Sequence, residues 1–246
     1  MLLFRPIAVL LLLLGLTLSA HAAPDGACPA DPPRPKLVLP HLRAALQDNR
    51  EGLIVALGSS STQGVAASEL ARTYPAVLQA QLSAALPHWQ VAVLNRGIGG
   101  QDAREELARL ESDVIAVRPQ LVIWQVGANA ALHHADISLF RARLMDGVLR
   151  LKRAGIDVIL MDNQRTPRVL AAVEDSAIDH AIAETASEAG VNLFSRNHLM
   201  EAWAAEGASP AQFTSSDKLH QNDRGYVCLG RALAHAIVDA LSLLPS

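Results

Sequence analysis

Serine, aspartate and histidine residues occur in this sequence in a pattern that could perform acyl transfer. Ser59, Ser60 and Ser61 stand in a row directly after an apolar run, and Asp217 and His220 lie three residues apart towards the other end. A serine hydroxyl attacks an ester carbonyl when an imidazole takes its proton, and a carboxylate can hold that imidazole in the required tautomer. A spacing of three lets one tight turn bring Asp217 and His220 together. Taken separately, the serines are equally typical of a polar turn, and the Asp–His pair of a cap or surface feature.

Two further stretches could supply hydrogen-bond donors for a negatively charged oxygen. The residues Gly97 to Gly100 come just before a predicted helix, where backbone N–H groups can remain free to meet an anion. They are not a dinucleotide fingerprint because position 102 is Asp, and we expect Asp102 to cap the next helix with Glu105 completing a capping box. Asn129 offers a side-chain amide, although a single asparagine is also typical of a turn.

The sequence argues against two classes of ligand. A Walker-type phosphate loop needs two glycines with four residues between them, then Lys and Ser or Thr, whereas Gly58 and Gly64 have five between them and Val65 follows. The chain has 24 acidic and 21 basic residues, a net charge of −3 and no long basic run. We therefore expect neither a phosphate loop nor a nucleic-acid partner.

The elements that must position these residues follow an alternating pattern of strands and helices. Short apolar runs, typical of strands covered on both faces of a parallel sheet, occur at Leu53 to Leu57, Val91 to Leu94, Leu121 to Val126, Val158 to Met161 and Val191 to Phe194. Helical spacing lies between them, most clearly from Ile137 to Leu151, where Asp136 is placed to cap the start and Gly155 the end. The pattern predicts an α/β fold, a three-layer α/β/α sandwich with a mainly parallel five-stranded sheet.

The stretches that could do chemistry all fall where such a sheet binds ligands, beyond the carboxyl ends of its strands. The serine, glycine and asparagine stretches each follow a predicted strand, and the Asp217–His220 pair comes just before the last predicted helix. A nucleophile, a base, an orienting acid and oxyanion donors are thus expected at one edge of the sheet.

In this order the four stretches resemble the SGNH (GDSL) hydrolase family, over about residues 53 to 243. That family reads Gly-Asp-Ser in its first block, ends its second in glycine, and continues with Gly-x-Asn-Asp and Asp-x-x-His. The resemblance implies a flavodoxin-like fold, with Ser60 as nucleophile, His220 as base and Asp217 as acid. It also implies an oxyanion hole formed by the N–H groups of Ser60 and Gly100 and the amide of Asn129, with no metal and no organic cofactor.

Three positions depart from the family pattern. Ser59 stands where the family usually has Asp, and Ser61 where it usually has an aliphatic residue. Ala130 replaces the usual Asp after Asn129, which removes part of the support for that loop. We expect activity to be tuned by these changes, because every catalytic role still has a residue.

The N-terminus predicts export. Arg5 precedes an apolar run from Ile7 to Leu18 and a small-residue cleavage pattern, which is typical of a signal peptide over residues 1–22. A retained membrane anchor is the alternative, but the run is short of the ~20 apolar residues that a spanning helix needs. We expect a periplasmic or secreted protein without stable membrane insertion after signal cleavage, an extended arm and lead-in over residues 23–50, and one domain over residues 51–246.

The two cysteines of the chain, Cys28 and Cys228, lie near the two ends of the predicted mature protein. An exported chain can keep them oxidised, so a Cys28–Cys228 disulfide is expected, with two separate buried thiols as the alternative.

These observations together favour an exported serine esterase or acylhydrolase that acts on a small-molecule or polysaccharide ester. An O-acyltransferase using the same residues, or a non-catalytic glycan-binding domain, are the alternatives. With few aromatic residues no broad sugar platform is evident, although Trp124 and Trp203 could contribute locally. His133 and His134 could line the pocket mouth, but adjacent residues point apart, and solvent-facing histidines are the simpler interpretation.

Overall fold

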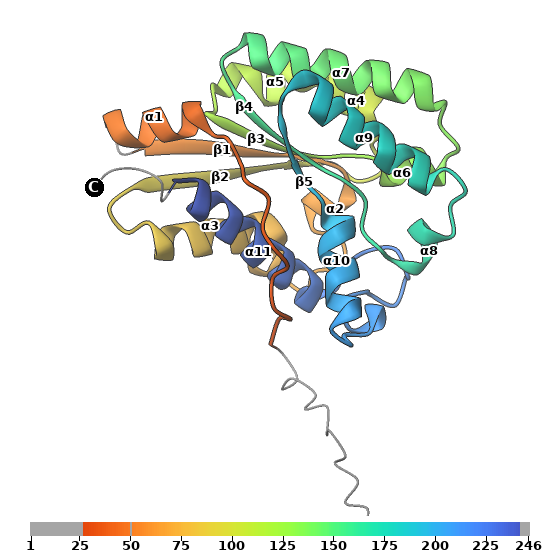
Figure 1. Ribbon diagram of the computed structural model, residues 1–246. Helices are drawn as coiled ribbons and strands as arrows, with labels where there is room; N and C mark the ends of the chain where they lie inside the picture. Colours follow the sequence, from red (N-terminus) through yellow and green to blue (C-terminus); the bar gives the residue numbers. More distant parts are fainter. Residues whose placement is uncertain (1–26, 50, 242–246) are drawn as a thin grey trace, which may run out of the picture.

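The structure of the protein is a computed structural model that describes residues 27–49 and 51–241 (Figure 1). The predicted signal peptide, residues 1–22, lies outside the described residues. Among the residues that are described, no helix is both long and apolar enough to cross a membrane.

A five-stranded parallel sheet forms the centre of the domain. Its strands are β1 (Glu51–Gly58), β2 (Gln90–Gly97), β3 (Leu121–Gln125), β4 (Asp157–Met161) and β5 (Asn192–Phe194), in the order β2-β1-β3-β4-β5. Each of the five predicted apolar runs overlaps one strand. The central strands β3 and β4 are buried at every position, as runs without polar alternation require. The predicted α/β sandwich is confirmed.

Helices cover both faces of the sheet (Figure 1). One core lies under α4 (Ala103–Ala108), α5 (Leu110–Asp113), α7 (Ile137–Arg153) and α9 (Asp175–Ala189). The other lies under α1 (Pro40–Asn49), α3 (Tyr74–Ala85), α10 (Arg196–Ala205) and α11 (Asp223–Leu241). Short helices at the connections are α2 (Ser60–Gln63), α6 (Ala128–Leu132) and α8 (Pro167–Leu170), with 3-10 turns at Leu70–Arg72, Ile115–Val117 and Pro210–Gln212.

The helix caps that the sequence predicted are present. The Asp136 side chain accepts a hydrogen bond from the Leu139 N–H at 2.9 Å at the start of α7, and Gly155 adopts a positive φ of 71° just after its end. Asp102 and Glu105 form the predicted capping box at the start of α4. These caps connect residues only two or three positions apart, which is why a sequence pattern reveals them.

Two long helices were not predicted. Helix α1 lies within the segment expected to be an extended lead-in, and its Leu42 N–H donates to Asp157 Oδ2 on β4 at 2.9 Å. Helix α10 begins after Ser195, whose hydroxyl accepts from the His198 N–H at 3.0 Å. The hydrogen-bond acceptor for the first turn of α1 is a residue far away in the sequence, so no local sequence pattern predicts this helix start.

The prediction that Trp124 and Trp203 could contribute to a sugar platform is wrong. Their exposed fractions are 0% and 1%. Trp124 packs in the core beneath α7, where a side chain on Gly147 would collide with its ring. Trp203 packs against Phe213 with ring centroids 4.7 Å apart. Both rings are core residues because their strand and helix turn them away from solvent.

The N-terminal arm is fastened across α11. Cys28 and Cys228 form a disulfide, which confirms the predicted pairing. Asp31 accepts a hydrogen bond from His235 at 2.5 Å, and Arg34 Nε lies 2.6 Å from Asp239 Oδ2. Residues 28–34 of the arm are therefore tied to α11.

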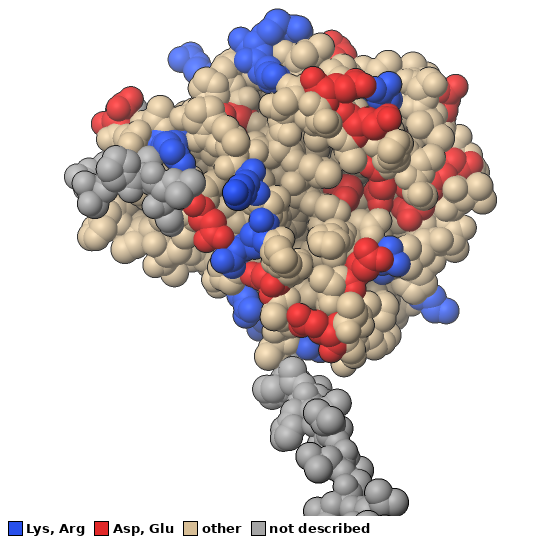
Figure 2. All heavy atoms as spheres, in the orientation of Figure 1, with Lys and Arg blue, Asp and Glu red and all other residues tan. Residues whose placement is uncertain are grey.

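Charges are mixed on the face of the molecule that Figure 1 presents. Figure 2 shows basic and acidic side chains interspersed among uncharged ones on the face of Figure 1. This distribution agrees with the small net charge of −3.

Candidate active site

Ser60 is the first residue of α2, directly after the sharp turn by which the chain leaves β1 at the carboxyl edge of the sheet. The turn needs Gly58, because a Cβ there would collide with the Thr62 side chain and come within 2.8 Å of the Gln125 carbonyl oxygen. Gly97 on β2 is equally necessary, since a Cβ there would overlap the backbone of Gln63. The two glycines let α2 pack directly against the sheet, which presents Ser60 at its edge.

A single side chain from β3 holds this turn. Gln125 Oε1 accepts hydrogen bonds from the Ser59 N–H at 3.2 Å, the Ser59 hydroxyl at 3.3 Å and the Thr62 hydroxyl at 3.1 Å. Ser59 and Ser61 are both buried, with exposed fractions of 4% and 2%. Only Ser60 of the three serines is partly exposed and bonded to a histidine.

The structure brings together the three residues predicted from opposite ends of the chain. His220 Nε2 lies 2.8 Å from Ser60 Oγ, and His220 Nδ1 lies 2.6 Å from Asp217 Oδ2. With its Nδ1–H directed at the carboxylate, the imidazole has its Nε2 lone pair free to accept the serine proton. This arrangement can generate an alkoxide-like nucleophile at Ser60.

Asp217 organises the turn that carries His220. Its Oδ1 accepts from the N–H groups of Leu219 and His220, each at 2.9 Å, and from the Ser215 hydroxyl at 2.8 Å. Partial burial raises the pKa of the Asp217 carboxyl, but the hydrogen bonds from His220, Leu219 and Ser215 outweigh that effect and hold the pKa below its ordinary value. Asp217 is therefore ionised over the whole neutral range.

Three donor groups, on Ser60, Gly100 and Asn129, follow the carboxyl ends of β1, β2 and β3. Among the described residues, no acceptor pairs with the N–H of Ser60 or of Gly100. Gly100 adopts a φ of 81°, a conformation that favours glycine, and beyond its two chain neighbours no heavy atom lies within 4 Å of its ideal Cβ position. Asn129 Nδ2 donates one hydrogen to the Gln101 carbonyl at 2.7 Å, which fixes the amide beside the Gly100 loop and leaves its second hydrogen available.

Arg109, which was not predicted from the sequence, connects the turn before Ser60 with the loop that contains Gly100. Arg109 donates from Nη2 to the Gly58 carbonyl at 3.1 Å and from Nε to Gln101 Oε1 at 2.6 Å. Gln125 was missed as well, although a polar residue at the end of the buried run Leu121–Gln125 was a visible signal. No local spacing marks Arg109, because its partners come from other elements.

The helix that follows the glycine loop is anchored by a buried carboxyl group. Glu106 on α4 is fully buried and accepts a hydrogen bond from Trp124 Nε1 at 2.8 Å. Burial raises the pKa of Glu106 to about 8, and the bond from Trp124 offsets only part of that effect. Glu106 is therefore protonated in the folded protein at neutral pH.

This carboxyl group predicts a pH-dependent stability. The folded pKa of about 8 lies above the ordinary value of 4.5. The contribution of this carboxyl group to the free energy of unfolding is therefore full below pH 4.5 and is lost as the pH rises from there through 8. In the wild type, this group should lower the free energy of unfolding by about 1.4 kcal/mol for each pH unit across this window. In Glu106→Gln this fall should be absent. Urea denaturation at several pH values measures it. Glu201→Gln, at an exposed glutamate, is the control, and curves of equal slope for wild type and Glu106→Gln would refute the assignment.

The two histidines after α6 lie on the surface. His133 and His134 are exposed, and His134 Nδ1 lies 2.8 Å from Glu174 Oε2. Within the described part of the chain, no three His, Cys, Asp or Glu residues gather as a metal site would require.

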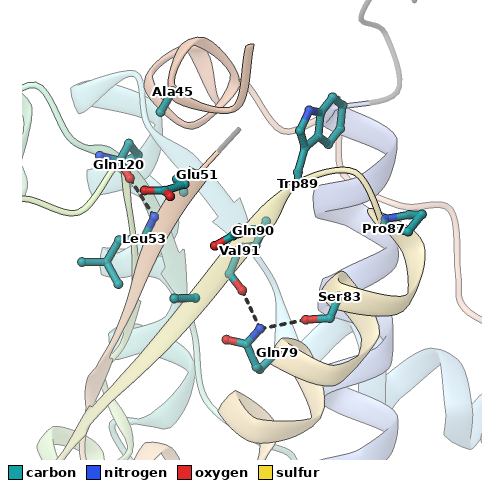
Figure 3. Close-up of a pocket in the computed structure, with 12 residues that line it drawn as sticks. Ala45, Glu51, Leu53, Gln79, Ser83, Pro87, Trp89, Gln90, Val91 and Gln120 are labelled. Carbon is teal, nitrogen blue, oxygen red and sulfur yellow. Dashed lines mark hydrogen bonds between the residues drawn. The ribbon is translucent and has the colours of Figure 1, made fainter. Parts of the chain in front are cut away.

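A cleft of about 830 Å³ lies at the opposite edge of the sheet, beside the first residues of β1 and β2 (Figure 3). The Gln79 amide in it donates to the Val91 carbonyl and accepts from the Val93 N–H at 2.6 Å, so it covers the free edge of β2. Because Ser60 follows the carboxyl end of β1, this cleft is separate from the candidate active site.

The same fold occurs in solved esterase structures. Axe2, an acetylxylan esterase from Geobacillus stearothermophilus, matches with a TM-score of 0.65 and 22% identity, over 76% of this chain and 94% of that chain. A two-domain esterase active on acetylated mannans, co-crystallised with mannopentaose, matches with a TM-score of 0.70 and 19% identity, over 84% of this chain and 55% of that chain. A G-D-S-L-family protein from Desulfitobacterium hafniense DCB-2 matches with a TM-score of 0.62 and 20% identity, over 75% and 99%. No curated protein matches the chain.

The predicted membership of the SGNH (GDSL) family is supported only at the level of the fold. The similarity to the G-D-S-L-family protein is one of fold, at 20% identity. Ser59 replaces the Asp of the Gly-Asp-Ser block, and its hydroxyl bonds to Gln125. The chain belongs to the non-GDSL lipase-like family, whose model matches residues 25–243.

Proposed function

We propose that this protein is a serine esterase that hydrolyses small O-acyl esters of carbohydrates. The observation that carries the proposal is the hydrogen-bonded series from Ser60 Oγ through His220 to Asp217, at 2.8 and 2.6 Å. The similarity in fold to esterases that act on acetylated xylan and mannan supports a carbohydrate ester as the substrate. The predicted signal peptide over residues 1–22 supports export. Export agrees with such a substrate, because acylated polysaccharides lie outside the cytoplasm.

In the first half of the reaction, Ser60 Oγ attacks the ester carbonyl while His220 Nε2 takes its proton. Asp217 holds the Nδ1–H and stabilises the imidazolium that forms. The N–H groups of Ser60 and Gly100 and the free hydrogen of the Asn129 amide stabilise the negative oxygen of the tetrahedral intermediate. His220 then gives its proton to the departing sugar oxygen as the bond between that oxygen and the carbonyl carbon breaks, so the sugar leaves as an alcohol and an acyl-serine remains.

In the second half, water replaces the sugar alcohol. His220 takes a proton from the water, which attacks the acyl-serine carbonyl, and the same donors stabilise the second tetrahedral intermediate. Its collapse returns the proton to Ser60 Oγ and releases a carboxylic acid. Side chains and backbone amides of this chain carry every step of both half-reactions.

The substrate class is tested by comparing acyl groups and alcohols. We expect acetate release from acetylated xylo- and manno-oligosaccharides, and a kcat/KM for aryl esters that falls by about tenfold or more from acetyl to octanoyl, as a site for a small acyl group requires. A preference for octanoyl esters without acetate release from the saccharides would indicate a lipid esterase instead. Transfer of acetate to an added sugar at the expense of hydrolysis would indicate an acyltransferase.

A further inference from the structure

The turn that carries Asp217 and His220 receives three hydrogen bonds from the segment after β4. Gln164 Nε2 and Thr166 Oγ1 both donate to the Leu219 carbonyl, at 3.0 and 2.9 Å. The Arg168 N–H donates to the Lys218 carbonyl at 3.0 Å. Leu219 directly precedes His220, so two side chains from another part of the fold hold the peptide unit that leads into the histidine.

That peptide unit is fixed at both of its ends. Its carbonyl oxygen accepts from Gln164 and Thr166, and its N–H, which belongs to His220, donates to Asp217 Oδ1 at 2.9 Å. Gln164 and Thr166 are buried, with exposed fractions of 2% and 0%. Water cannot readily replace donors at this depth, so the orientation of the peptide plane depends on these two side chains.

The same turn contains a backbone conformation that needs such support. Lys218 has a φ of 60°, in the left-handed region that a side chain disfavours. Conformations of this kind persist where the surroundings over-determine them. Here Arg168 holds the Lys218 carbonyl and Asp217 holds the Leu219 N–H.

The segment that supplies the donors is itself anchored. Asp162 accepts from the Ser195 hydroxyl at 2.5 Å and from the Asn197 N–H at 2.9 Å, at the start of α10. The Asn163 N–H donates to Asp179 Oδ1 on α9 at 3.1 Å. Gln164 and Thr166 therefore extend from a part of the chain tied to two helices.

We propose that Gln164 and Thr166 are positioning residues for His220, holding the Leu219 carbonyl so that the imidazole stays within reach of Ser60. This inference rests on the proposed function. The bond from His220 Nε2 to Ser60 Oγ is 2.8 Å long, and rotation of the peptide unit before His220 would move the ring. A displacement of about 1 Å at a reacting group can lower the rate by on the order of 10²-fold.

The test uses Thr166→Val, which keeps the shape and removes the donor, Gln164→Met, and the double variant. For an aryl acetate we expect kcat to fall by about tenfold in each single variant and by on the order of 10²-fold in the double variant, with KM changed by less than about threefold. The rate at which a fluorophosphonate labels Ser60 should fall in parallel, because it reports activation of the hydroxyl. Thr166→Ser keeps a donor and should restore most of kcat.

Thr185→Val is the matched control. Thr185 is equally buried and its hydroxyl also donates to a backbone carbonyl, that of Ala181 within α9, at 2.7 Å. It should lower Tm as much as Thr166→Val does and leave kcat unchanged. Equal kcat values for Thr166→Val, the double variant and Thr185→Val would overturn the inference. A kcat for Thr166→Ser no higher than that of Thr166→Val would overturn it as well. Activity that survives in Ser60→Ala would instead overturn the proposed function.

Discussion

Ser60→Ala should remove nearly all ester hydrolysis, with a loss in kcat of on the order of 10⁴-fold or more. The reason is that Ser60 Oγ is the hydroxyl bonded to His220 Nε2, at 2.8 Å. Labelling by a serine-directed fluorophosphonate should disappear together with the turnover, and Tm should stay close to that of the wild type. Initial rates on an aryl acetate and mass spectrometry of the labelled protein measure these outcomes.

The neighbouring serines provide the controls. Ser61→Ala should keep both turnover and labelling. Ser59→Ala should keep labelling too and cost some stability, because the Ser59 hydroxyl donates to Gln125 in the support of the turn. Labelling that persisted in Ser60→Ala and vanished in Ser59→Ala or Ser61→Ala would place the nucleophile one residue away.

Asn129→Ala should lower kcat by on the order of 10² to 10³-fold with little change in KM, the loss expected when one preorganised oxyanion donor is removed. Its amide is held by the bond to the Gln101 carbonyl at 2.7 Å, so the second hydrogen has a fixed direction. Asn129→Asp keeps the size and replaces the donor by an acceptor, and it should be at least as slow. Steady-state kinetics on the aryl acetate give both constants.

A matched truncation separates this effect from a loss of folding. Asn192 also donates from Nδ2 to backbone carbonyls, those of Val38 and Val158, but it lies at the start of β5, away from Ser60. Asn192→Ala should lower Tm and leave kcat in place. An unchanged kcat in Asn129→Ala would identify Asn129 as a turn former only.

The strands, the main helices and the caps could be predicted from the amino-acid sequence. Buried parallel strands contain unbroken apolar runs, as from Leu121 to Trp124, and a cap such as Asp136 bonds only three residues ahead. The Asp217–His220 pair is local in the same sense, since one turn joins the two residues. Such signals survive in a linear sequence because their physics acts over a few residues.

The groups that support the site depend on tertiary contacts instead. Gln125 reaches the Ser59 turn from another strand, and Gln164 and Thr166 reach the Leu219 carbonyl from 55 and 53 residues away. The residues between 162 and 166 are all polar, which the sequence shows, but nothing in it identifies their partners. The burial of Trp124 and the bond from the first turn of α1 to Asp157 likewise depend on neighbours that the fold brings together. Hydrogen bonds between distant segments leave no periodicity or spacing in the sequence, because they form only after the sheet and its helices have fixed where each residue lies.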